Sequence, residues 1–414
     1  MGTITACLRY NTEEDPSQMV VTWSTMSPTS NSTAQYGIAA FNVSAFGTQV
    51  QFVDGGSEKH TQYIHRVIMS GLVPGQIYTY RCGSTMGWSN LYRFTAMKAG
   101  NNWSPRLVMF GDLGNSNAQS LPRVQEDTQR GMYDALLHIG DFAYDMNTDN
   151  ARVGDEFMEQ IEPIAATLPY MTCPGNHEQA YNFSHYKNRF AMPTDMYGEK
   201  MFYSFDIGPA HIISLSTEYL FYLQYGDAQA ARQYEWLEQN LKMANTPAKR
   251  AQTPWIITMG HRPMYCSNTG VFGCVHPEND IVRVGDPTHH LQGFENLFDA
   301  YGVDVMLWAH LHSYERMWPV YNLTVYNGST KAYTNPNAAV HITTGSAGCK
   351  ERHAYFKNET EVWSAFRSTD YGYTRMHILN STHLYWEQVS DDKGGAVIDR
   401  AMLIKTKHGP YRRA

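Results

Sequence analysis

The sequence has no excess of positive charge. Only 17% of its 414 residues are Asp, Glu, Lys or Arg, and the formal net charge is −7. The acidic residues are spread along the chain, and no basic stripe is present that could follow a polynucleotide backbone. We therefore expect no nucleic-acid partner.

Long apolar runs are also missing. No uninterrupted apolar stretch approaches the length of a membrane-spanning helix, so we expect no membrane span. The segment Met1–Cys7 is too short and too weakly apolar to be a signal peptide. Ala6 stands where a myristoylation signal carries a hydroxyl residue, which argues against that lipid anchor as well.

Cysteine is scarce, with six in the chain. Cys266 and Cys274 bracket a short loop that contains glycine and asparagine, and a disulfide between them is one prediction; six reduced, partly buried thiols are the alternative. Acceptor sites for N-linked glycans are abundant instead, in eight Asn-x-Ser/Thr sequons at Asn31, Asn42, Asn102, Asn182, Asn322, Asn327, Asn358 and Asn380. They favour a secreted, extracellular or lysosomal glycoprotein, and we expect its leader to have been lost from this chain.

Residues 1–98 have the pattern of a small antiparallel β-sandwich. Short alternating segments such as Met19–Ser24 and Ile77–Cys82 are separated by glycine and proline. Leu72, Pro74 and Tyr78 resemble the Leu-x-Pro-x-x-x-Tyr corner of fibronectin type III modules, in which the tyrosine hydroxyl ties a turn to a strand. We expect Trp23 and Tyr78 to be core residues. The polar segment 98–105, which ends in proline, is the predicted linker.

Residues 105–408 read as a second domain of the α/β type. Near-continuous apolar runs, typical of strands buried on both faces, alternate with helical patterns. In the segment Gln229–Lys242, apolar residues recur at helical spacing, which predicts an amphipathic helix that covers a sheet. Residues 371–405 return to strand-like segments that could complete a second sheet.

Each of five apolar runs leads into residues that bind metals. In α/β folds ligands bind outside the carboxyl ends of the strands, so five strand ends with such side chains predict one convergent pocket. The candidate ligands are Asp112, Asp141, Tyr144, Asn176, His261, His310 and His312.

The residue types suggest two cations. An aspartate can bridge two cations through its two oxygens, and Asp141 is the natural bridge. Tyrosine has an ordinary pKa near 10, so Tyr144 would bind as phenolate only to a strongly Lewis-acidic metal such as ferric iron. Nitrogen and oxygen donors from Asn176, His261 and His310 suit zinc, ferrous iron or manganese. His310 and His312, two positions apart, would share one face of an extended strand.

These motifs, in this order, resemble the purple acid phosphatases, a branch of the metallophosphoesterases, over almost the whole chain. Many metallophosphoesterases begin with Asp-x-His, whereas this chain has Asp112-Leu113-Gly114 and carries Tyr144 instead. The segments 254–266 and 308–319 are similar to the animal high-molecular-weight form. Ala309 departs from the family's glycine, and we expect its methyl group to tighten the turn without removing a ligand.

The resemblance implies the architecture and the ligand set. It implies a fibronectin type III-like β-sandwich followed by a metallophosphoesterase domain with two mixed sheets flanked by helices. It also implies a binuclear metal centre in which Asp141 bridges. Ferric iron would be held by Asp112, Asp141, Tyr144 and His312, and a divalent zinc, iron or manganese ion by Asp141, Asn176, His261 and His310.

The implied activity is hydrolysis of small orthophosphate monoesters by a metal-bound hydroxide. His177, next to Asn176, would bind phosphate and protonate the leaving group. Relatives carry further histidines nine or ten residues after the position of His261, where this chain has Gly270 and Val271. His276 could reach the same space if the Cys266–Cys274 loop folds back, and a solvated loop residue is the alternative.

The roles of two residues next to the candidate ligands are open, and so are three alternative functions. Arg262 could contact phosphate or support a loop, and Glu178 is expected to orient His177 or a ligand. The alternatives are a phosphodiesterase or pyrophosphatase on the same metals, a non-catalytic extracellular metal-binding module, and iron-based redox chemistry. The sequence does not indicate the physiological substrate, the divalent metal or the oligomeric state.

Overall fold

The computed structural model describes residues 7–10, 15–190, 192–193, 200–327, 331–411 and 413. Residues 1–6, on which most of the predictions about a signal peptide and a lipid anchor depend, lie outside the described residues, as does Ser329 of the Asn327 sequon. None of the described helices combines the length and apolar character that crossing a bilayer requires.

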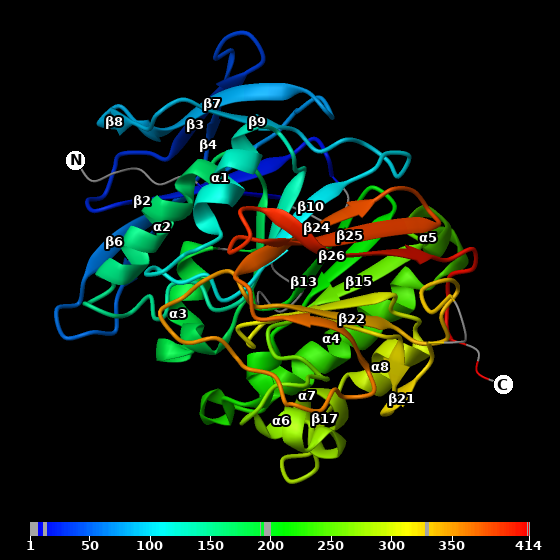
Figure 1. Ribbon diagram of the computed structural model, residues 1–414. Coiled ribbons are helices and arrows are strands. Elements are labelled where there is room, and N and C mark those ends of the chain that lie inside the picture. Colours follow the sequence, from blue (N-terminus) through cyan, green and yellow to red (C-terminus); the bar gives the residue numbers. More distant parts are fainter. Residues whose placement is uncertain are drawn as a thin grey trace.

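The N-terminal part of the chain is a sandwich of two antiparallel sheets (Figure 1). Trp23, Tyr80 and Phe94 are among its buried core residues. The hydroxyl of Tyr78 accepts a hydrogen bond of 2.9 Å from the backbone N–H of Val73, which is the tyrosine corner that the sequence predicts. One sheet has the order β1 (Cys7–Tyr10), β2 (Met19–Thr25), β6 (Thr61–Met69) and β5 (Thr48–Val53); the other has β4 (Val43–Phe46), β3 (Thr33–Gly37), β7 (Ile77–Ser84) and β8 (Gly87–Trp88), with β9 (Tyr92–Thr95) also paired to β7.

A six-stranded mixed sheet follows the sandwich. Its first three strands are parallel and buried, and its last three are antiparallel and come from the C-terminal segment. The predicted strands of residues 371–405 therefore complete the sheet that β10 begins. The strand order is β12 (Tyr170–Cys173), β11 (Ala135–Ile139), β10 (Arg106–Phe110), β24 (Gly372–Ile378), β25 (His383–Ser390) and β26 (Ala396–Ile404).

A seven-stranded mixed sheet packs against the first one. Four neighbouring strands, β14, β15, β18 and β22, run parallel. The order is β13 (Tyr203–Ile207), β14 (Ala210–Ser214), β15 (Trp255–Met259), β18 (Val305–Trp308), β22 (Val340–Thr344), β19 (Tyr314–Met317) and β23 (Ser364–Ser368). Two short hairpins stand apart, β16 (Gly285–Asp286) with β17 (Leu291–Gln292) and β20 (Val320–Tyr321) with β21 (Thr324–Val325).

Helices cover the outer faces of the two sheets, which confirms the predicted architecture (Figure 1). α1 and α2 lie on the side of the sandwich, and α4, α7 and α8 lie beyond the second sheet. The predicted amphipathic helix is α4, in which Leu237 and Leu241 are buried. The helices are α1 (Leu121–Gln129), α2 (Arg152–Ala165), α3 (Ala180–Arg189), α4 (Ala228–Ala244), α5 (Pro247–Gln252), α6 (Phe272–Val275), α7 (Ile281–Val284) and α8 (Glu295–Ala300), with 3-10 turns η1 (Asn176–Glu178), η2 (Thr217–Leu220), η3 (Leu223–Tyr225) and η4 (Pro277–Asn279).

Candidate metal centre

The loops that carry the predicted donors meet where the two sheets join. Gly111, directly after β10, donates its backbone N–H to the carbonyl of Thr344 at the end of β22, over 2.9 Å. Asp112 donates its backbone N–H to the carbonyl of Gly140, which follows β11, over 3.2 Å. Because the carboxyl ends of strands from both sheets are tied together, loops that are far apart in sequence are held in one place.

Asp112, Tyr144 and His312 form a first group of donors. The hydroxyl of Tyr144 lies 3.0 Å from Oδ1 of Asp112 and 2.9 Å from Nε2 of His312. That nitrogen lies 3.4 Å from Oδ1 of Asp112. Ligands about 2.1 Å from a shared cation lie roughly 3 Å from one another, so these three atoms have the spacing of one cation's ligands.

The electrostatics of this group fit a strongly charged cation. Burial and the carboxylates of Asp112 and Asp141 raise the pKa of Tyr144 well above its usual range. Burial lowers the pKa of His312, but the hydrogen bond to Asp112 outweighs it and raises this pKa to about 12. The group therefore attracts positive charge, and it would yield a phenolate only beside a strongly Lewis-acidic cation.

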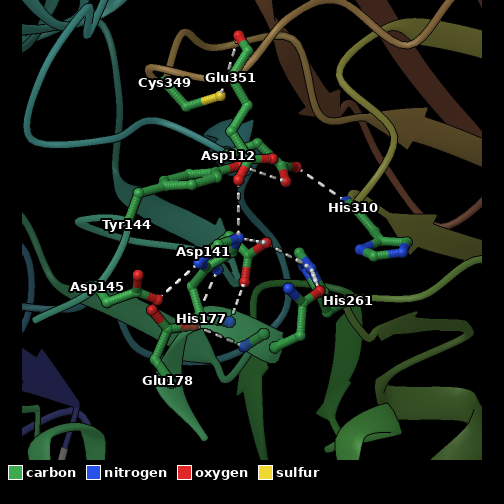
Figure 2. A network of polar contacts seen from close by, with 12 residues as sticks. Asp112, Asp141, Tyr144, Asp145, His177, Glu178, His261, His310, Cys349 and Glu351 are labelled. Carbon is green, nitrogen blue, oxygen red and sulfur yellow. Dashed lines mark hydrogen bonds and ion pairs between the residues drawn. The ribbon is translucent and has the colours of Figure 1, made fainter. Parts of the chain in front are cut away.

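Asp141, Asn176, His261 and His310 form a second group beside the first (Figure 2). Nε2 of His261 lies 3.1 Å from Oδ2 of Asp141 and 3.2 Å from Oδ1 of Asn176. Donor atoms of Asp141, His261 and His310 all lie within 4.8 Å of one another. The backbone N–H of His310 donates to Oδ2 of Asp112 over 2.8 Å, which links the two groups.

His261 is oriented by the backbone of the neighbouring sheet. Its Nδ1 lies 2.9 Å from the carbonyl of Ile139, which accepts the ring proton and leaves Nε2 to face Asp141. Gly140 has φ +77 and passes so close to the His261 ring that a side chain there would overlap it. Burial lowers the pKa of His261, but the Asp141 carboxylate outweighs it and raises this pKa to about 10.

His310 and His312 lie in the bend between β18 and β19, so the prediction of an extended strand for this motif is wrong. His310 has φ +67, a left-handed conformation that directs it away from the path of the strand. The two histidines consequently join different donor groups. Ala309 fits because its methyl group occupies the space that Gly111 leaves free, and both histidines remain in place.

Backbone strain concentrates at the candidate ligands. Asp112, Asp141, Tyr144 and His310 have φ values of 58, 51, 52 and 67. Non-glycine residues adopt this region at an energetic cost, and such residues cluster at functional sites. Four of the seven candidate ligands have this conformation, which fits loops that are shaped for a task.

Glu178 links the backbones of the loops that follow β11 and β12. It is 2% exposed, and its carboxylate accepts hydrogen bonds from the backbone N–H groups of Asp141, Phe142 and Gly175 at 2.8–3.0 Å. Burial and the charge of Asp141 raise the pKa of Glu178 to about 8. Of the two expectations for Glu178, the structure therefore bears out the orientation of a candidate ligand, Asp141, through its backbone.

Arg262 supports a neighbouring loop, as one of the two sequence-based alternatives expects. Its Nε donates to both carboxylate oxygens of buried Glu218 at 3.0 Å. Its Nη1 donates to Nε2 of His310 over 3.1 Å. Burial and the charge of Arg262 lower the pKa of His310 well below its usual range, so this ring stays neutral, which is the form that a metal ligand requires.

His177 lies at the open side of the donors, between two carboxylates (Figure 2). Its Nδ1 is 2.7 Å from Oδ1 of Asp145, and its Nε2 is 3.6 Å from Oε1 of Glu351. Nε2 is also 4.0 Å from Oδ2 of Asp141. Burial lowers the pKa of His177, but the hydrogen bond to Asp145 and the charge of Asp141 outweigh it and raise this pKa to about 9.

His276 makes its contacts within its own loop. The side chain is half exposed, its Nδ1 lies 3.5 Å from Glu278, and its ring lies beside Phe272. The disulfide between Cys266 and Cys274 is present, as predicted. Both cysteines pack with Leu311, which stands between His310 and His312.

Sequence reasoning missed three acidic residues near the centre. Asp145 follows Tyr144 directly, and that position could have pointed to it. Glu218 and Glu351 come from loops with no motif of their own, and the local sequence carries no sign of their contacts with Arg262 and His177.

Two mixed sheets whose joined ends collect carboxylate, phenol, amide and imidazole donors define the class of metal-dependent phosphoesterases. The family model described as "Calcineurin-like phosphoesterase" matches residues 105–314. The models described as "Purple acid Phosphatase, N-terminal domain" and "Iron/zinc purple acid phosphatase-like protein C" match residues 8–96 and 338–400.

Comparison with known proteins identifies one family within this class. The chain is 55% identical over 399 residues to "Acid phosphatase type 7" of Homo sapiens, covering 95% of this chain and 90% of the human protein. The protein of the same name from Danio rerio is also 55% identical, with 95% and 89% covered. A purple acid phosphatase from yellow lupin seeds superposes with a TM-score of 0.80 at 25% identity, over 97% of this chain and 74% of that one.

This chain belongs to the purple acid phosphatase family. Membership indicates a binuclear metal centre and metal-dependent hydrolysis of phosphoesters.

Proposed function

We propose that this protein is an acid phosphatase that hydrolyses small orthophosphate monoesters. The observation that carries the proposal is the pair of adjoining donor groups, one with the phenol of Tyr144 and one built from amide and imidazole. The name of the animal relatives points to the same reaction. We assign ferric iron to Asp112, Tyr144 and His312, and a divalent zinc, iron or manganese ion to Asn176, His261 and His310, with Asp141 between them; the donor chemistry supports this assignment.

When bound, the two cations supply Lewis acidity that lowers the pKa of a water and neutralises charge on the phosphoryl oxygens. The residues of the chain keep that arrangement in position. Glu178 fixes the backbone of Asp141, and Ile139 sets the ring of His261. Arg262 orients His310 through a contact that is itself anchored on Glu218.

His177 has the position of a residue that handles the leaving group. Asp145 accepts a hydrogen bond from Nδ1, which leaves an N–H on Nε2 when the ring is protonated. Nε2 lies on the side of Asp141, and the His177 side chain is 18% exposed. We assign to this N–H the binding of a phosphoryl oxygen and the donation of a proton to the leaving alkoxide.

His276 stays a prediction as a second residue that faces the substrate. It would have to turn away from Glu278 to assist His177. Unchanged turnover of an alkyl phosphate by the His276→Ala variant would remove it from the mechanism. A loss of about 100-fold or more, in the range of general acid catalysis, would support it.

The wider setting belongs to the same proposal. We assign residues 1–98 to the sandwich domain and residues 105–408 to the catalytic domain. The eight sequons and the disulfide favour a secreted or lysosomal glycoprotein. Removal of N-glycans from protein expressed in animal cells, followed by mass spectrometry of each sequon, tests this assignment.

The decisive experiment compares hydrolysis of p-nitrophenyl phosphate and bis-p-nitrophenyl phosphate from acid to neutral pH. The variants are Asp141→Asn and, as a matched control, Asp149→Asn, whose side chain is exposed. Monoester turnover that is strongest in acid, is lost in Asp141→Asn and is kept in Asp149→Asn would support the proposal. Preference for the diester would favour a phosphodiesterase, and no turnover by protein loaded with two metals would favour a metal-binding module.

A further inference from the structure

Glu351 occupies an unusual place for a residue without a catalytic motif. Its neighbours fasten its backbone across the first donor group: Nζ of Lys350 donates to the carbonyl of Tyr144 over 2.7 Å, and Nδ1 of His312 bonds to the carbonyl of Arg352 over 2.8 Å. Between these two anchors, the side chain of Glu351 reaches toward His177, where Oε1 lies 3.6 Å from Nε2 (Figure 2).

We propose that Glu351 selects substrates by the charge of their leaving group, admitting neutral and cationic alcohols and disfavouring anionic ones. The inference rests on the proposed function. Nε2 of His177 is the atom assigned to the leaving oxygen, and it is also the atom that Glu351 contacts. The alcohol part of the substrate, which is bonded to that oxygen, must therefore lie beside the Glu351 carboxylate.

The charged residues described next either face away from the leaving group or are compensated, so the Glu351 carboxylate is the charge that acts on the leaving group. Asp145 is the other carboxylate on His177, but it faces Nδ1, on the opposite side of the ring. Lys350 is turned to the carbonyl of Tyr144. Asp141 lies among the candidate ligands, where bound cations compensate its charge. Glu351 has a side chain that is 48% exposed, so it borders the space through which an alcohol would leave.

Coulomb's law sets the size of the effect. Two unit charges about 4 Å apart interact by about 1 kcal/mol in water-like surroundings, which corresponds to a factor of about five in binding. An anionic group next to the leaving oxygen is repelled by this amount, and an ammonium group is attracted by it. The preference between the two is expected to reach roughly tenfold or more.

The test uses three small substrates of similar length: phosphoethanolamine, glycerol 2-phosphate and phosphoglycolate. Their leaving groups are cationic, neutral and anionic. The enzyme loaded with metals is assayed with all three substrates at one fixed, mildly acidic pH. We expect the wild type to prefer phosphoethanolamine over phosphoglycolate in kcat/KM, and Glu351→Gln to reduce that ratio by roughly tenfold or more. Glu351→Lys should invert the order, and Glu359→Gln, an exposed residue of the same loop, should leave it unchanged.

A binding measurement separates this inference from the proposed function. Calorimetric titration with 2-aminoethylphosphonate, propylphosphonate and 3-phosphonopropionate gives the same charge series on ligands that are not hydrolysed. A charge preference that Glu351→Gln abolishes would support the inference even if no monoester were turned over, a result that would overturn the phosphatase proposal alone. An equal charge preference in the wild type, Glu351→Gln and Glu351→Lys would overturn the role of Glu351.

Discussion

The residues of the metal centre are dominated by buried negative charge. Asp112 and Asp141 are each 1% exposed or less, and the pKa values of His261 and His312 are raised because these rings face carboxylates. Burying charges without partners is costly, so a site of this composition binds protons until cations replace them. Because these side chains are buried and charged, a substitution that changes a single atom should have a large effect on stability and on metal binding.

Glu178→Gln replaces an acceptor of three backbone hydrogen bonds with a side chain that has one acceptor oxygen. An N–H group of the new amide would face the backbone N–H groups of Asp141, Phe142 or Gly175. We expect a loss of about 2–4 kcal/mol in the free energy of unfolding and a decrease of about 10–100-fold in metal affinity. Urea unfolding and metal competition titrations measure the two effects. Exposed Glu159→Gln is the control, and equal behaviour of both variants would contradict the role of Glu178.

Tyr144→Phe removes one donor from the first group and leaves Asp112 and His312 in place. We expect metal affinity at this position to fall by about tenfold or more, since even residues that only orient ligands contribute that much. Metal analysis after dialysis should show about one ion per chain in place of about two. Tyr181→Phe, which alters an exposed ring, should keep the full content. Retention of both ions by Tyr144→Phe would show that the phenol is not a ligand.

Among the structural elements, the bend between β18 and β19 depends on the disulfide loop. Cys266, Cys274 and Leu311 form a small buried cluster, against which Val271 and Ala354 pack. Leu311 separates His310 from His312, so this cluster lies under both candidate ligands. The disulfide is thus placed to affect the metal centre as well as local stability.

Replacing Cys266 and Cys274 with serine opens a loop of sequence separation 8. We expect a loss of about 2–3 kcal/mol in the free energy of unfolding, mainly because the unfolded chain gains freedom. The bend should also release its metal faster, which transfer of metal to an excess of chelator can follow. Dithiothreitol should reproduce the loss of stability in the wild type and leave the stability of the double variant unchanged. Unchanged metal release would limit the disulfide to a stabilising role.

At the scale of the whole molecule, the sandwich is joined to the catalytic part by buried and partly buried polar contacts. Asp54 of the sandwich pairs with His185 of α3 at 2.8 Å, and Asp155 of α2 pairs with His60 at 3.0 Å and with Arg189 at 2.8 Å. α3 follows directly on η1, which carries Asn176 and His177. The sandwich therefore supports the element that leads out of the metal centre.

Acid should lower the free energy of unfolding because some histidines are buried in their neutral form. His65 is one of them. Burial lowers the pKa of His65 from 6.5 to about 4. Between these values the unfolded chain binds a proton that the native chain does not, so the contribution of His65 to stability is complete above about pH 6.5 and is lost as the pH falls toward 4.

His65→Gln removes this titration in the sandwich. The free energy of unfolding of the wild type should fall more steeply with decreasing pH than that of the variant, by up to about 1.4 kcal/mol per pH unit in this window. Urea unfolding at several pH values measures the slopes. Exposed His290→Gln should retain the wild-type slope, and parallel curves for the wild type and His65→Gln would contradict the prediction.

Much of this protein could be predicted from local patterns. The alternation in Met19–Ser24 and the apolar runs before Asp112, Asp141 and His261 predict strands because side-chain period and burial leave a direct trace in the sequence. The candidate donors in both groups were also predicted, since their chemistry and order resemble a family. These features depend on residue type and spacing along the chain.

Other features depend on which loops meet in space. The clamp of Glu178 on three backbone N–H groups joins the loops after β11 and β12, which are neighbours in the six-stranded sheet. The pairing of Arg262 with Glu218 joins the segments after β15 and β14 of the seven-stranded sheet, and the bend that separates His310 from His312 connects two strands of that sheet. The contact of Glu351 with His177 joins residues from separate loops. Sequence patterns report the neighbours of a residue along the chain, whereas these contacts are set by which strands pair within a sheet and by how the two sheets pack together, which no local pattern encodes.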